Sequence, residues 1–288
     1  MSNKILVLGA TGNVGSALVE ALVEKGEQVK AGTRHPAEYP ATKNVEPVAL
    51  DFEQPKAETY AAALDGVNRI FALTKTADVH ADKTLNPLID QAKAAGVYHI
   101  VLMTAMGVDQ ADADVSSIRR VELHLINSGI NYTILRPNWF MQNFAPGFLL
   151  PMIQQGGTIY LPTDDAKTSF IDARDIAAVA AAALTEEGHA GKEYTLTGGE
   201  ALSYGEAAII LSEAANREIS YVAIDEKAFL EGMISAGWLP EQAEFMAMLF
   251  SIVRQGWSAP VVPVVNEVLG REPIALQQYA FDHADAWK

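Results

Sequence analysis

The chain has 288 residues, a length that suits one α/β body with a small appended lobe better than two independent domains. Its formal net charge of −15 disfavours nucleic-acid binding, because an acidic surface repels phosphate backbones. The chain has no cysteine and only six scattered histidines, so we expect neither disulfides nor thiol nucleophiles nor a metal site.

The first half alternates short β-rich runs with longer helical segments, which predicts a parallel sheet covered by helices on both faces. The predicted strands are 4–8, 28–32, 45–50, 69–73, 99–104 and 132–135. The predicted helices are 13–25, 57–64, 84–95 and 117–127. With right-handed crossovers, this order gives the doubly wound Rossmann fold.

The regular alternation of strands and helices ends after Pro137, where an aromatic segment (138–148) leads into short strands and helices. We predict strands at 158–161, 169–171, 194–197 and 219–224, amphipathic helices at 174–184 and 204–215, and a helical tail over 229–257. We therefore expect a Rossmann core over 1–137. Residues 138–288 are expected to form mainly a small α+β substrate-binding lobe, with some segments returning to the Rossmann core.

The tail carries Met, Phe and Trp at helical spacing, which usually marks core packing. A lid over a ligand and the face of a homodimer are the alternatives. No apolar run approaches the roughly 18–20 residues that cross a bilayer, and the N-terminus lacks the pattern of a secretory signal. We therefore expect a cytoplasmic protein with no membrane partner.

A glycine loop follows the first strand directly and opens the first helix. It reads Gly9, Ala10, Thr11, Gly12, Asn13, Val14 and Gly15. The three glycines suit a tight turn, close approach of a pyrophosphate and close packing of helix on sheet, and the helix N-terminus offers free N–H groups. We predict a dinucleotide site here; the alternative is a glycine turn without a ligand.

The end of the second strand carries Arg34, where an NAD-specific site would have Asp or Glu. A guanidinium binds a 2′-phosphate bidentately, so Arg34 favours NADP(H), unless it is only a solvated surface residue. The end of the fourth strand (Leu73, Thr74 and Lys75) and Thr104 after the fifth strand are further candidates for cofactor contact.

The glycine spacing resembles that of the short-chain dehydrogenase/reductase superfamily in its extended and atypical branches. The resemblance implies that Asp51 and Phe52 contact adenine, although Asp51 also suits a simple turn at the strand end. Members of that superfamily use a Tyr-x-x-x-Lys pair in proton transfer. Family spacing puts Asp114 and Ile118 at those two places, so the pair is absent.

This absence, together with Arg34, the segment from Leu135 to Asn143 and the later Ser-Phe-Ile-Asp-Ala-Arg-Asp run, is similar to the NmrA-like branch of the superfamily. That branch includes triphenylmethane-dye reductases, NADPH quinone reductases and NADPH-sensing regulators. The Arg-Pro-x-Trp-Phe-Met-x-Asn run is particularly similar to the ergot-alkaloid reductases that act on iminium ions.

A ketone needs protonation as hydride arrives, whereas an iminium, a quinone or a cationic dye is already electrophilic. The sequence thus predicts an NADPH-dependent reductase of a small, conjugated, pre-activated acceptor; a regulator that senses NADP(H) without turnover is the alternative. An isomerase is disfavoured, because sugar epimerisation needs a base. Thr104, Asp114 and Glu122 are the candidates for any catalytic role, and the predicted substrate-stacking residues are Trp139, Phe140, Met141 and Phe144.

Overall fold

The computed structural model describes residues 4–51, 57–73 and 78–288, and the chain forms two compact units. Unit 1 comprises residues 1–137 and 173–195, and unit 2 comprises 138–172 and 196–288. The chain therefore leaves the first unit after the sixth strand and returns once, for one helix and one strand. Within the described ranges, no helix is long and apolar enough to cross a bilayer.

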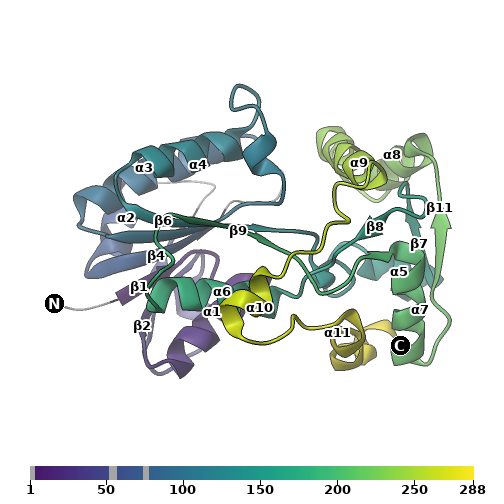
Figure 1. Cartoon of the computed structure of the whole chain (residues 1–288), viewed down its shortest axis with the longest axis horizontal. Coiled ribbons are helices and arrows are strands. Elements are labelled where there is room, and N and C mark those ends of the chain that lie inside the picture. The colour runs from purple at the N-terminus through teal and green to yellow at the C-terminus, as the bar shows by residue number, and fades with distance from the viewer. Residues whose placement is uncertain (1–3, 52–56, 74–77) are drawn as a thin grey trace. The chain divides into compact units, whose positions relative to one another are not determined.

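Unit 1 contains a seven-stranded sheet in the order β3-β2-β1-β4-β5-β6-β9 (Figure 1). Its strands are β1 (Lys4–Val7), β2 (Gln28–Thr33), β3 (Val45–Ala49), β4 (Val67–Leu73), β5 (His99–Met103), β6 (Asn131–Pro137) and β9 (Lys192–Leu196). The ladders from β3 to β6 are all parallel. This is the predicted doubly wound Rossmann fold, with its topological switch between β1 and β4.

Helices cover both faces of this sheet, which explains why its central strands are apolar without alternation. The helices of unit 1 are α1 (Asn13–Glu24), α2 (Ala57–Leu64), α3 (Ala81–Ala94), α4 (Ser117–Asn127) and α6 (Ala173–Thr185). In Figure 1, α3 and α4 lie together on one face and α1 and α6 on the other. In β1, Ile5, Leu6 and Val7 are completely buried.

Residues 173–195, which follow Pro137 in the C-terminal half of the sequence, belong to unit 1; they hold α6 and all of β9 except its last residue. Helix α6 packs along α1 and is buried almost all round, so its predicted single apolar face is wrong. Its run of alanines lets the two helices approach closely, because each side chain adds only one methyl group. Strand β9 follows as the last strand of the large sheet.

Unit 2 holds two small sheets and a separate aromatic core. Its strands are β7 (Thr158–Leu161), β8 (Lys167–Thr168), β10 (Leu202–Ser203) and β11 (Ser220–Ala223). Its α-helices are α5 (Leu150–Gly156), α7 (Tyr204–Ala215), α8 (Glu226–Ser235), α9 (Pro240–Arg254), α10 (Val264–Leu269) and α11 (Leu276–Asp282). Phe144, Tyr204, Phe229, Phe250 and Trp287 are fully or almost fully buried in one cluster.

Two predictions for this unit are wrong in detail. The strand predicted at 169–171 lies instead at 167–168, because Ser169 bonds to the tail: its N–H donates to Ser258 O, and its hydroxyl donates to Pro260 O at 2.8 Å. The tail is two helices and not one, since Gly237 has a positive φ of 92° and Pro240 begins α9. The interpretation of its Phe229, Met233 and Met246 as packing residues is confirmed.

Candidate functional site

The glycine loop lies at the carboxyl end of β1, next to the switch point of the sheet. Gly9 has a φ of +64°, a conformation that side chains other than glycine adopt rarely. A Cβ on Gly15 would lie 2.0 Å from Gly9 O, and a Cβ on Gly12 would lie 3.3 Å from the same oxygen. The loop therefore folds so tightly against the start of α1 that only glycine fits at position 15.

The first turn of α1 is open to an anion. Gly12 is its N-cap and has no side chain to cap the helix, and the first turn holds no acidic residue. The backbone N–H groups there have no acceptor within the helix, and the helix dipole is positive at this end. Thr11, Gly12 and Asn13 are exposed, whereas the side chain of Val14 is buried, which leaves only its backbone for a contact. This geometry suits a pyrophosphate.

The neighbouring strand ends bring other predicted cofactor residues to the same edge. Ala10 N–H donates to Gly32 O, and Leu50 N–H donates to Thr33 O, so the ends of β1, β2 and β3 lie side by side. Arg34 follows β2 with an exposed side chain, and the half-buried Asp51 follows β3.

On the other side of the loop, Leu73 ends β4, and one of its methyl carbons lies 3.0 Å from the position that a Cβ on Gly9 would take. Three other predicted residues (Phe52, Thr74 and Lys75) lie outside the described residues. Thr104 follows β5, where its N–H donates to Leu135 O and its side chain is buried.

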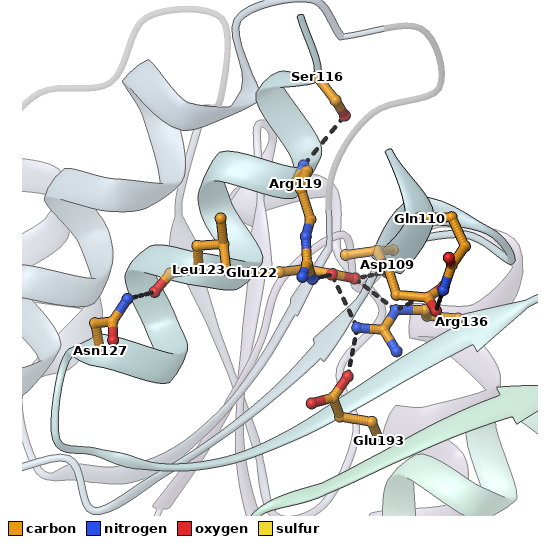
Figure 2. Close-up of polar contacts among 10 residues, drawn as sticks. Asp109, Gln110, Ser116, Arg119, Glu122, Leu123, Asn127, Arg136 and Glu193 are labelled. Atoms are coloured by element: carbon orange, nitrogen blue, oxygen red, sulfur yellow. Dashed lines mark hydrogen bonds and ion pairs between the residues drawn. The ribbon is translucent and has the colours of Figure 1, made fainter. Parts of the chain in front are cut away.

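The hydroxyl of Thr104 donates to the carboxylate of Glu122 on α4, at 2.7 Å. Glu122 is completely buried and lies between two guanidinium groups (Figure 2). Arg136 donates to both of its oxygens at 2.9 Å, and Arg119 donates at 2.7 Å. Arg136 also donates to Glu193 of β9 at 2.6 Å. Four strands and helices of unit 1 therefore meet in one polar network.

The two carboxylates of this network favour the charged form of Arg136. Burial disfavours the charged guanidinium of Arg136, but its hydrogen bonds to Glu122 and Glu193 outweigh burial and raise the pKa of Arg136. Every acceptor position on the Glu122 carboxylate is engaged, which is the environment of an anchoring carboxylate and not of a proton donor. Asp114 lies exposed in the turn before α4, where its N–H donates to Asp112.

Unit 2 has its own candidate ligand surface. Of the four predicted substrate residues, Trp139 and Phe140 are half-buried, whereas Met141 and Phe144 are buried in the core. The ring of Trp139 stacks on that of Phe250, with centroids 5.0 Å apart. Phe144 contacts Phe170 and Tyr204 edge-on and at a tilt, so its role in this structure is packing.

A cavity of about 270 Å³ also lies within unit 2, and Met141 is one of its walls. Sequence reasoning missed the rest of it: Phe170, Gly199, Glu200, Leu202 and residues 272–276. Most of its lining residues are apolar, and Glu200 and Glu272 are among the others. Pro273 in the sequence marks a break between two helices, but no local pattern places this segment beside Met141.

Comparison with known proteins places these features in context. The sequence matches the NmrA-like family over residues 1–266. An NAD(P)H azoreductase of Xenophilus azovorans is 35% identical, over 98% of this chain and 99% of the relative. Festuclavine dehydrogenase of Aspergillus fumigatus is 30% identical, over 98% of each chain. The structure of an NADPH-dependent quinone oxidoreductase of Escherichia coli in complex with NADPH superposes with a TM-score of 0.84 at 25% identity, covering 96% of this chain and 98% of the other.

Proposed function

The chain belongs to the NmrA-like family, and we propose that it is an oxidoreductase that uses NADP(H) bound to unit 1. The observation that carries this proposal is the glycine loop, whose tight turn and uncapped helix N-terminus suit a pyrophosphate. The names of the azoreductase and quinone oxidoreductase relatives support the same cofactor class. When bound, NADPH supplies a hydride.

The preference for NADPH over NADH rests on Arg34. Its guanidinium is exposed after β2, and the strand end carries no carboxylate that would repel a 2′-phosphate. Asp51 follows β3 at the same edge, and its proposed contact with adenine comes from the family resemblance.

We propose that the acceptor is a small conjugated molecule with an electrophilic C=N, N=N or quinone group. Family spacing assigns Asp114 and Ile118 to the places of the Tyr and Lys, and Asp114 is exposed. The Glu122 carboxylate is saturated with hydrogen bonds. None of these groups is arranged as a strong general acid. An acceptor that is already electrophilic needs positioning more than protonation, so its reduction tolerates this arrangement.

Unit 2 is the proposed substrate lobe. Trp139 and Phe140 are half-buried, so part of each side chain remains accessible to a conjugated acceptor. A cationic acceptor over an aromatic ring gains about 0.5–2 kcal/mol. The cavity bordered by Met141 adds an apolar wall with two carboxylates, which suits an acceptor that has a cationic end.

The proposal is tested by following NADPH oxidation with a panel of acceptors: a cyclic iminium, a quinone, an azo dye, a triarylmethane dye and a simple ketone. We expect turnover of the conjugated acceptors and none of the ketone, and Trp139→Ala should reduce turnover while leaving the Kd of NADPH unchanged. Equal rates for ketone and iminium would refute the argument from the missing acid. Tight NADPH binding without any turnover would instead indicate a sensor of NADP(H).

A further inference from the structure

The hydrogen bonds around Glu122 determine the orientation of the O–H bond of Thr104. Oε1 accepts from Thr104 at 2.7 Å and from Arg136 Nε at 2.9 Å. Oε2 accepts from Arg136 Nη2 at 2.9 Å and from Arg119 Nη1 at 2.7 Å. With two donors on each oxygen, both oxygens of the carboxylate act as acceptors. The proton of the Thr104 hydroxyl must therefore point at Glu122.

In this arrangement Thr104 Oγ1 can only accept a hydrogen bond from any further partner. A threonine hydroxyl has one donor and two acceptor positions, and the single donor is already used. The residue cannot donate to the oxygen of a ketone or a quinone, but it can accept from an N–H group. Rotation away from Glu122 would break a buried hydrogen bond to a charged group, which is unfavourable.

The position of Thr104 in the sheet identifies that N–H group. The pyrophosphate site follows β1, and Arg34 marks the adenosine side beyond β2. The other half of a dinucleotide therefore extends in the opposite direction, over the carboxyl ends of β4 and β5. Thr104 follows β5 directly. The carboxamide of nicotinamide carries the N–H donors of that half.

We propose that Thr104 Oγ1 accepts a hydrogen bond from the carboxamide N–H of NADP(H), and that Glu122 is the positioning residue that keeps the hydroxyl in this orientation. The proposal rests on the proposed function, because it requires the dinucleotide on unit 1. It assigns Glu122 a role in orienting a cofactor contact without any proton transfer. Arg136 and Arg119 hold the carboxylate in place for this role.

A chemical double-mutant cycle tests the proposal by binding and not by activity. The Kd values of NADPH and of its 3-acetylpyridine analogue, which has a methyl in place of the amide NH₂, are measured by calorimetry. The variants are Thr104→Val, which removes the acceptor at nearly constant shape, and Thr104→Ser, which keeps it. Glu122→Asp retains the charge beside Arg136 but withdraws it from Thr104. Thermal unfolding of each variant without cofactor shows whether the fold is intact.

We expect wild-type protein and Thr104→Ser to bind NADPH about 10-fold more tightly than the analogue, as one hydrogen bond allows. In Thr104→Val the two Kd values should agree within about 2-fold, and in Glu122→Asp the ratio should fall to about 3-fold. If the ratio of the two Kd values in Thr104→Val stayed at its wild-type value, whether or not both cofactors bound more weakly, the proposal would be overturned. A wild-type protein that binds neither cofactor would overturn the proposed function as well, so the two failures are distinguishable.

Discussion

Replacing Gly15 by alanine should strongly weaken the binding of a dinucleotide, although the change adds only one methyl group and no charge. The added Cβ would lie 2.0 Å from Gly9 O, 2.7 Å from Gly9 C and 3.0 Å from Ala10 Cα. All three atoms belong to the backbone, so no side chain can rotate away, and the loop or the start of α1 must move by about 1 Å. A shift of this size breaks hydrogen bonds from the loop to a pyrophosphate, each of which contributes about 1.5–3 kcal/mol.

The loss of two such bonds costs about 3 kcal/mol, so the Kd of NADPH should rise by at least about 100-fold in Gly15→Ala. Gly12→Ala should have a smaller effect of about 10-fold, because its Cβ would lie 3.3 Å from Gly9 O and needs only a slight adjustment. Titration calorimetry gives the Kd, and thermal unfolding without cofactor measures the stability of each variant separately.

Gly232 provides the matched control within the same chain. It lies exposed in α8, and a Cβ there meets nothing within 4 Å. Gly232→Ala should bind NADPH like the wild type and should be more stable by up to about 1 kcal/mol, since alanine favours a helix. If Gly15→Ala folded and bound NADPH within about 3-fold of the wild type, the assignment of the loop as a phosphate site would be wrong.

Three further predictions concern Arg34, the buried carboxylate of Glu122 and the buried imidazole of His99. Arg34→Ala should raise the Kd of NADPH by about 10-fold or more and change that of NADH by less than 2-fold, and equal losses would remove the case for a 2′-phosphate site. Glu122→Ala should lower the free energy of unfolding in urea by about 3–5 kcal/mol, because it leaves two guanidinium groups without their buried partner, whereas Glu231→Ala on the surface should cost less than about 1 kcal/mol. Burial and the nearby positive charges of His189 and Arg69 lower the pKa of His99 from 6.5 to about 4, so its stabilisation is complete above pH 6.5 and decreases as the pH falls toward 4. His99→Gln should therefore remove about 2 kcal/mol of the stability difference between pH 7 and pH 5, and an unchanged pH profile would contradict this.

Local patterns predicted the elements of unit 1 well. Most predicted strands and helices agree with the structure to within a few residues, and the helices at 57–64 and 117–127 agree at both ends. The reason is that a strand between turns and a helix with one apolar face leave their periodicity in a short stretch of sequence. The same holds for the glycine loop, because its conformation depends only on the end of one strand and the start of the helix that follows it.

The identity of neighbouring residues across the fold was not predictable in this way. Glu122 contacts Arg119, which is three residues away in the sequence, and Arg136, which is 14 residues away. Arg136 in turn contacts Glu193, which is 57 residues further along the chain. No periodicity relates these positions, because β9 reaches its place beside β6 only after the chain has passed through part of unit 2. Glu122 was therefore a candidate acid in the sequence, and its saturated hydrogen bonds became visible only in the fold.

The sequence by itself determined the Rossmann fold, the glycine loop at its switch point and the arginine that follows the second strand, because each depends on a short run of residues and on rules of chain connection. Tertiary structure alone decided that the Thr104 hydroxyl donates to a buried carboxylate, that α6 and β9 complete unit 1, and that residues 272–276 line a cavity with Met141. These features depend on which distant segments pack together, and that choice comes from burying the apolar surface of the whole chain at once.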